Sequence, residues 1–312
     1  MELYKSRGFS EFFQDTFLFL KLNGKHFFAA YFIINGIFLL LLAIVGYFFS
    51  KFYTEIIFGG ILNGNNGGTV IDEYIDQNLG VFVIILFIFI IIALIAGVVS
   101  YAFPAIYLKL YTEKGSNNFT TKDIINTYKT NIGKLLIFVI CSIIIAIPLL
   151  FVFAICGFVL MITIVGILLI PLLLGAFMLF YSMTLMEYLE NKKDIWSSFG
   201  YSWKLLTSKF WAAVGSVGLF YLMSYVIQNI ITIIPYMFGM ASIFTNIENP
   251  NQEDIGNTMM IVMLFVFFLS FLLGAILGNI VQLNQGIVFY SLKEKNENIN
   301  TKSIIDQIGS GE

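Results

Sequence analysis

The fold is decided by residues 135–186, which read LLIFVICSIIIAIPLLFVFAICGFVLMITIVGILLIPLLLGAFMLFYSMTLM. Two cysteines and one tyrosine are the only ionisable side chains in this run. A helix rises about 1.5 Å per residue and the hydrocarbon layer of a membrane is about 30 Å thick, so about 20 apolar residues make one crossing. The run is too long for one crossing. It predicts two crossings, joined by a tight turn between residues 154 and 163, near Cys156 and Gly157.

Similar apolar runs recur along the chain, and the composition agrees with them. Hydrophobic residues make up 59% of the sequence and charged residues 12%, whereas a soluble domain carries about 25% charge. The sequence therefore predicts an all-α, polytopic transmembrane helix bundle of about six spans. The expected spans are residues 27–49, 80–108, 135–153, 164–188, 210–234 and 258–290.

Positive charges partition between the two sides of this topology. Cytoplasmic segments of membrane proteins are enriched in Lys and Arg, and of the 17 such residues in the chain all but Lys51 fall on one side. That side, which also holds both termini, is predicted to be cytoplasmic, whereas the opposite loops, 50–79 and 246–257, are acidic. The predicted cytoplasmic cations are Lys5, Arg7, Lys21, Lys25, Lys109, Lys114, Lys122, Lys129, Lys134, Lys192, Lys193, Lys204, Lys209, Lys293, Lys295 and Lys302.

Three amphipathic segments precede the first, third and fifth spans. Each has apolar residues at helical spacing on one side and polar residues on the other, a pattern typical of a helix that lies in the headgroup layer. Three repeats of an interfacial helix followed by a transmembrane hairpin are predicted, at residues 1–112, 113–192 and 193–292, before a tail at 293–312. The apolar stripes are Phe9, Phe12, Phe13, Phe17 and Leu20; then Ile124, Ile125, Tyr128 and Ile132; then Ile195, Trp196, Phe199 and Trp203.

This organisation, the segment WSSFGYSWK at residues 196–204 and the exit of the last span through FYSLKEK at residues 289–295 resemble a group of bacterial six-helix membrane proteins. The membrane-embedded region of bacterial glycerophosphodiester phosphodiesterases is similar. The resemblance implies a multi-pass protein of the bacterial inner membrane. Only about twenty residues follow the last predicted span, so neither the phosphodiesterase barrel nor its hydrolase activity is expected here.

Residues that carry chemistry are few. The single histidine, His26, stands at the entry to the first span and is interpreted as an interfacial anchor rather than a pH sensor. One histidine and two intramembrane cysteines supply no ligand set for zinc or iron, and no nucleophile with a neighbouring base can be nominated. No catalytic residue, metal or cofactor is predicted. With no cysteine in the outer loops, a structural disulfide is not expected either.

Polar side chains gather in the last two spans. They are Gln228, Asn229, Thr232, Asn279, Gln282, Asn284 and Gln285. An unpaired amide in hydrocarbon costs several kcal/mol, so these residues either bond to neighbouring helices or line a polar pocket that binds a lipid headgroup or small solute. On the sixth span, Gly274 and Gly278 form a GxxxG element, which allows another helix to approach closely.

Two classes of function remain. The favoured one is a non-enzymatic accessory or scaffold subunit of a larger membrane assembly, for translocation, insertion or envelope biogenesis, or a lipid-organising component. The alternative is a permease or lipid-handling protein with a pocket between spans five and six. The expected partners are other integral membrane proteins and anionic headgroups, to which well-placed cations contribute roughly 1 kcal/mol each. Direct nucleic-acid binding is not expected, and contact with ribosomes stays open.

Overall fold

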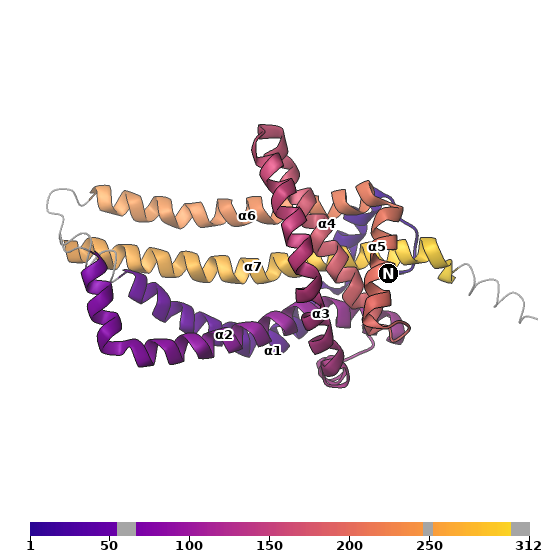
Figure 1. Cartoon of the computed structure of the whole chain (residues 1–312), viewed down its shortest axis with the longest axis horizontal. Helices are drawn as coiled ribbons and strands as arrows, with labels where there is room; N and C mark the ends of the chain where they lie inside the picture. The colour runs from indigo at the N-terminus through magenta and orange to yellow at the C-terminus, as the bar shows by residue number, and fades with distance from the viewer. Residues whose placement is uncertain (55–66, 246–251, 301–312) are drawn as a thin grey trace, which may run out of the picture. The chain divides into compact units, whose positions relative to one another are not determined.

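The chain is all-helical in a computed structural model that describes residues 1–54, 67–245 and 252–300. Figure 1 shows the helices with their labels. The described helices are α1 (Phe9–Thr54), α2 (Gly67–Lys114), α3 (Thr121–Met161), α4 (Ile164–Leu189), α5 (Ile195–Ser208), α6 (Phe210–Thr245) and α7 (Gln252–Glu297).

Six of these helices, all except α5, are long and apolar enough to cross a membrane. Many large apolar side chains lie exposed on them, for example Ile33, Leu94 and Ile147. Such surfaces are unfavourable in water and are satisfied by lipid. The predicted multi-pass helical class with six spans is confirmed. The predicted loop bounds are too wide, because α1 continues to Thr54, α2 begins at Gly67 and α7 begins at Gln252. Residues 55–66, 246–251 and 301–312 of the predicted loops and tail lie outside the described residues.

The three amphipathic segments are helical, but only the third is a separate helix. The first is continuous with α1 and the second with α3. At the start of α3 the Asp123 carboxylate accepts a hydrogen bond of 2.7 Å from the backbone N–H of Thr120, which satisfies a free donor of the first turn. From there α3 continues without a break into the apolar run that forms the third span. By contrast, α5 ends at Lys209, whose φ of −144° and ψ of 49° break the helical backbone before α6.

The turn between the third and fourth spans lies at the end of the predicted range of residues 154–163. Helix α3 runs through Cys156 and Gly157, near which the turn was expected, and the chain reverses at Ile162 and Thr163. The Thr163 hydroxyl accepts a hydrogen bond of 2.9 Å from the N–H of Gly166 and so caps α4. A threonine cap, rather than the glycine, decides where the hairpin turns. Both cysteines are free; Cys141 is buried and Cys156 is exposed.

The described chain divides into two compact units. Unit 1 comprises Met1–Ile34, Val98–Ser224 and Leu277–Glu312, and unit 2 comprises Asn35–Gly97 and Tyr225–Ile276. The core of unit 1 is aromatic: the Phe27 ring lies 4.9 Å from the ring of Tyr107, which lies 4.9 Å from that of Phe119. These contacts join α1, α2 and the α2–α3 connection.

Helices approach most closely at glycines. In unit 1, a Cβ atom added to Gly175 of α4 would lie 2.9 Å from the backbone nitrogen of Gly218 in α6. In unit 2, one added to Gly46 of α1 would lie 2.2 Å from the Phe267 ring of α7. At Gly175 the neighbour is backbone, so only glycine leaves room there, whereas at Gly46 the Phe267 ring would have to shift. Both crossings resemble small-residue contacts in other membrane bundles.

Candidate functional site

The polar residues predicted to form a pocket are divided between the units. Gln228, Asn229 and Thr232 belong to unit 2. The other four, Asn279, Gln282, Asn284 and Gln285, belong to unit 1.

In unit 2 the polar side chains of α6 bond largely along their own helix. The exposed Asn229 amide donates to the carbonyl of Tyr225 at 2.8 Å, and the Thr232 hydroxyl donates to the carbonyl of Gln228 at 2.8 Å. A Cβ atom on Gly274 would lie 3.8 Å from the Gln228 amide oxygen, whereas one on Gly278 would meet nothing within 4 Å. Of the two predicted packing glycines, Gly274 therefore lies beside α6.

In unit 1, Asn284 joins three helices. Its amide nitrogen donates to the Thr16 hydroxyl of α1 at 3.0 Å and to the Ser216 hydroxyl of α6 at 3.1 Å. Asn284 is fully buried on α7, so these bonds are shielded from competing water. The neighbouring Gln285 amide donates to the Tyr221 hydroxyl at 3.5 Å, a long contact. Around Asn284 and Gln285 the described contacts hold helices together.

The strongest electrostatic feature was not predicted: a buried ion network joins the C-terminal ends of α4 and α7. The Lys293 ammonium lies 2.5 Å from a carboxylate oxygen of Glu187 and 2.5 Å from one of Glu190. The side chains of Lys293 and Glu187 are both 0% exposed. The second oxygen of Glu187 pairs with Lys193, so each buried charge has an opposite partner.

Two tyrosines border this ion network. The Tyr4 hydroxyl donates to the second carboxylate oxygen of Glu190 at 3.3 Å, and the Lys193 ammonium lies over the Tyr201 ring. The Tyr201 hydroxyl donates to Glu297 at 2.5 Å. Burial, assisted by the neighbouring carboxylates, raises the pKa of both phenols well above the usual range. Both tyrosines therefore act as neutral donors.

Lysines also complete the end of α4. The last carbonyls of a helix have no partner within it, and cations near them interact favourably with the helix dipole. The Lys109 ammonium donates to the carbonyl of Leu189 at 2.6 Å, and the Lys134 ammonium donates to that of Tyr188 at 2.7 Å. Two of the lysines predicted to be cytoplasmic thus bond to the last carbonyls of α4.

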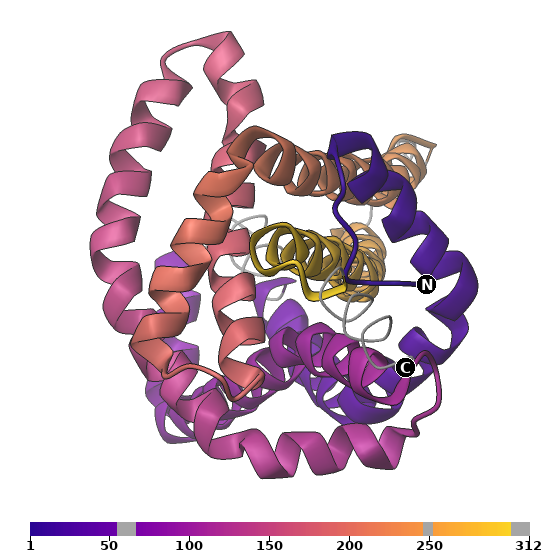
Figure 2. The same cartoon turned by 90° about the vertical axis from the view of Figure 1, so that its right-hand side faces the viewer.

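The N-terminal segment, residues 1–8, is tied to the same end of unit 1. Arg7 is 1% exposed and forms an ion pair of 2.6 Å with Asp15. Its guanidinium also donates to backbone carbonyls of residues 2, 3 and 5. The backbone N–H of Arg7 donates to the Ser291 hydroxyl at 2.8 Å, and the Lys209 ammonium donates to the backbone carbonyl of Arg7 at 2.9 Å. Figure 2 shows this segment beside the end of α7.

His26 is tied into the α2–α3 connection. Its Nε2 lies 3.1 Å from the carbonyl oxygen of Phe119 and its Nδ1 lies 2.7 Å from the Tyr107 hydroxyl. A carbonyl can only accept, so Nε2 carries a proton, and in the neutral ring Nδ1 accepts from Tyr107. His26 therefore anchors α1 to the loop that follows α2.

The arrangement favours structural roles for these charges. Within residues 1–54, 67–245 and 252–300, no three His, Cys, Asp or Glu side chains come together as a metal site. The charges of the ion network are matched, so it offers no free carboxylate to act as a base. Comparison of the chain with protein families, curated proteins and solved structures finds no match in any of the three.

Proposed function

We propose that this protein is a non-enzymatic accessory or scaffold subunit of a larger membrane assembly. The observation that carries the proposal is the hairpin tip, defined as residues 147–162 at the end of α3. Most of its large apolar side chains are exposed, including Phe151 at 71% and Phe158 at 70%. The tip contributes little to the core of unit 1.

Helix association inside a membrane depends on side-chain packing, because lipid tails already solvate apolar surface. A hairpin with few packed side chains gains stability when another helix fills the grooves between them. The hairpin tip is therefore suited to docking on a membrane partner. The buried ion network and Asn284 hold other helices of unit 1 together, so the hairpin tip extends from a well-packed part of the unit.

The membrane-facing surface of α5 supports a second element of the proposal, contact with lipid headgroups. Ile195 and Phe199 are buried against the rest of unit 1, whereas Trp196 and Trp203 are more than half exposed. Indole rings favour the boundary between lipid and water, and Lys204 lies beside them in sequence. We place this surface on the inner face of a bacterial cytoplasmic membrane, with both termini cytoplasmic. We also propose that the chain is related to the membrane-embedded region of bacterial glycerophosphodiester phosphodiesterases.

Site-specific photo-crosslinking tests the scaffold function. A photoreactive phenylalanine at position 151 or 158 is expected to capture one defined protein, and the same probe at Leu94, an exposed residue of α2, serves as the control. Replacement of Phe151 and Phe158 by Ala should abolish stoichiometric co-purification of that protein in mild detergent without loss of membrane insertion. Lipid adducts alone at all three positions, with the chain purifying by itself, would contradict the proposal.

Lipid handling is the second candidate. It is favoured by an apolar pocket of unit 1 that lies between α2, α3 and α4 and contains buried hydroxyl groups. This pocket is distinct from the polar residues of α6 and α7 on which the sequence-based alternative depended.

A further inference from the structure

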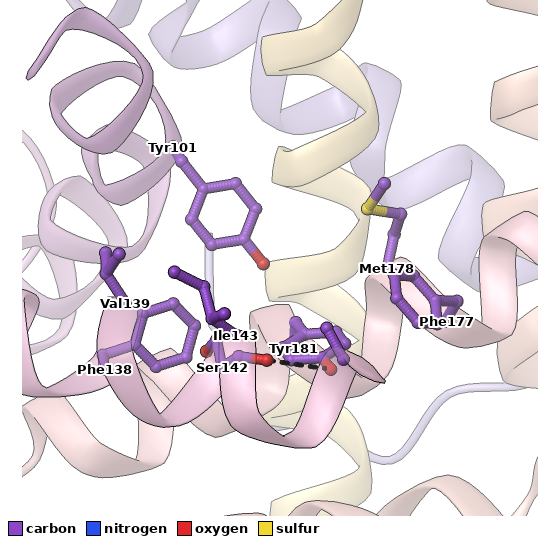
Figure 3. A pocket seen from close by; sticks show the side chains of 9 residues that line it. Tyr101, Phe138, Val139, Ser142, Ile143, Phe177, Met178 and Tyr181 are labelled. Carbon is purple, nitrogen blue, oxygen red and sulfur yellow. Dashed lines mark hydrogen bonds between the residues drawn. The ribbon is translucent and has the colours of Figure 1, made fainter. Parts of the chain in front are cut away.

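The apolar pocket of unit 1 has a volume of about 290 Å³ and is lined by nine side chains, four of them aromatic and none charged. Figure 3 shows its lining, with Tyr101 on α2, Phe138 and Ser142 on α3, and Tyr181 on α4. Ligand sites typically range from about 300 to 1,000 Å³. The pocket therefore suits a small ring or a short piece of chain, but not a whole phospholipid.

Two hydroxyl groups of the lining have unmet hydrogen-bonding capacity. The Tyr101 hydroxyl and the Ser142 hydroxyl are fully buried, and neither has a partner among the residues that the structure describes. The Tyr181 hydroxyl is occupied, because it donates to the Ser142 carbonyl at 3.4 Å. A buried hydroxyl without a partner costs about 1 to 3 kcal/mol. A ligand that supplies acceptors for Tyr101 and Ser142 recovers that cost.

The hydroxyls stand at matching places within the expected spans. Tyr101 stands about seven residues before the expected end of its span, Ser142 about seven after the start of its span and Tyr181 about seven before the end of its span. All three therefore belong to apolar runs that are expected to cross the membrane. An ionised headgroup is strongly disfavoured inside such a run.

Ile143 lies on the lipid-facing side of the pocket. Figure 3 shows it among the lining side chains. Ile143 is 59% exposed, so its side chain faces lipid and can rotate without disturbing the core. The pocket is therefore accessible to a ligand from the bilayer.

We infer that this pocket binds the ring of an uncharged prenylquinone from the bilayer. Ketone oxygens accept hydrogen bonds from Tyr101 and Ser142, which come from different helices, while the aromatic walls pack against a flat ring. The isoprenoid tail remains in the lipid. The absence of charge from the lining residues and the place of the donors within apolar spans favour this ligand over a phospholipid.

The test is binding of a labelled naphthoquinone with four isoprene units to the whole protein in lipid nanodiscs, with empty nanodiscs to subtract partition. Saturable binding of one quinone per chain is expected. Tyr101→Phe and Ser142→Ala should each weaken it by about three- to tenfold, the effect of one neutral hydrogen bond. The matched control Tyr225→Phe removes an exposed hydroxyl on α6 and should leave binding unchanged.

Stability of the empty protein provides a separate measurement. Tyr101→Phe removes a buried hydroxyl that lacks a partner, so it should leave the melting temperature equal or raise it while it weakens quinone binding. A misfolded variant would show the opposite effect on melting. Equal binding of a prenylnaphthalene that lacks ketones, equal affinity of Tyr101→Phe and the native protein, or preferential displacement by a neutral diacylglycerol would each overturn the inference.

Discussion

Replacement of Lys293 by Met should destabilise unit 1 more than any other single change of a lysine. Unit charges 2.5 Å apart attract by about 7 kcal/mol at an effective dielectric constant near 20. Lys293 makes two such contacts, to Glu187 and Glu190. Desolvation of the buried ions offsets most of this attraction, but removal of one partner leaves the others uncompensated, at a cost of about 3 to 5 kcal/mol.

The free energy of unfolding can be measured by SDS titration in mixed micelles with tryptophan fluorescence as the signal. All three tryptophans of the chain lie at residues 196–211, on α5 and the start of α6, so they report on unit 1. The matched control is Lys192→Met. That lysine is 64% exposed and lies 3.8 Å from Glu190, and exposed pairs of this kind contribute at most about 1 kcal/mol.

The double variant Lys293→Met with Glu187→Gln separates charge from packing. It removes one buried charge of each sign, so it should recover roughly half or more of the stability that the single variant loses. Lys193 keeps access to solvent and tolerates the loss of its partner. Two results would show that the buried charges are not coupled. In the first, Lys293→Met has the same free energy of unfolding as Lys192→Met. In the second, the double variant loses as much stability as Lys293→Met and Glu187→Gln lose together.

Two further substitutions test other parts of unit 1. Asn284→Ala should cost about 1 to 3 kcal/mol, because it breaks the buried bonds that join α7 to the Thr16 hydroxyl of α1 and the Ser216 hydroxyl of α6. Asn229→Ala should cost less than about 1 kcal/mol, because the exposed Asn229 amide bonds along its own helix; SDS titration compares the two variants. Arg7→Met should increase amide hydrogen exchange in residues 2–8 by about tenfold or more, because it breaks the buried contacts of the N-terminal segment. Lys5→Met is the matched control, and equal exchange in the two variants would show that Arg7 does not hold the segment.

The six spans could be predicted from the sequence because each depends on the hydropathy of a continuous run. The ends of helices depend on single side chains and were predicted less well. Cys156 and Gly157 suggested a turn, yet a glycine inside an apolar helix is tolerated in a membrane. Thr163 was the better signal, because its hydroxyl can cap a helix, and it stands where α4 begins.

The ion network was missed because Lys293 is far in sequence from its other members. Glu187 and Lys293 are separated by 106 positions, and hydropathy does not report which charges meet. A local signal was present: Glu187 falls inside the predicted span 164–188, where an ionisable side chain calls for a partner. For α5 the sequence predicted the helix but not which of its apolar side chains are buried. Its apolar stripe was recognised, but only tertiary packing separates buried Phe199 from exposed Trp196 and Trp203.

The central claim is that six helices cross a membrane with the α2–α3 connection on the inner face. Single cysteines introduced at Asn65, Asn117 and Asn296, in a chain whose own cysteines are replaced, can be labelled in intact cells with an impermeant maleimide. Asn65, which lies outside the described residues, should react from outside, whereas Asn117 and Asn296 should react only after the membrane is opened. Labelling of Asn117 from outside would contradict the proposed orientation.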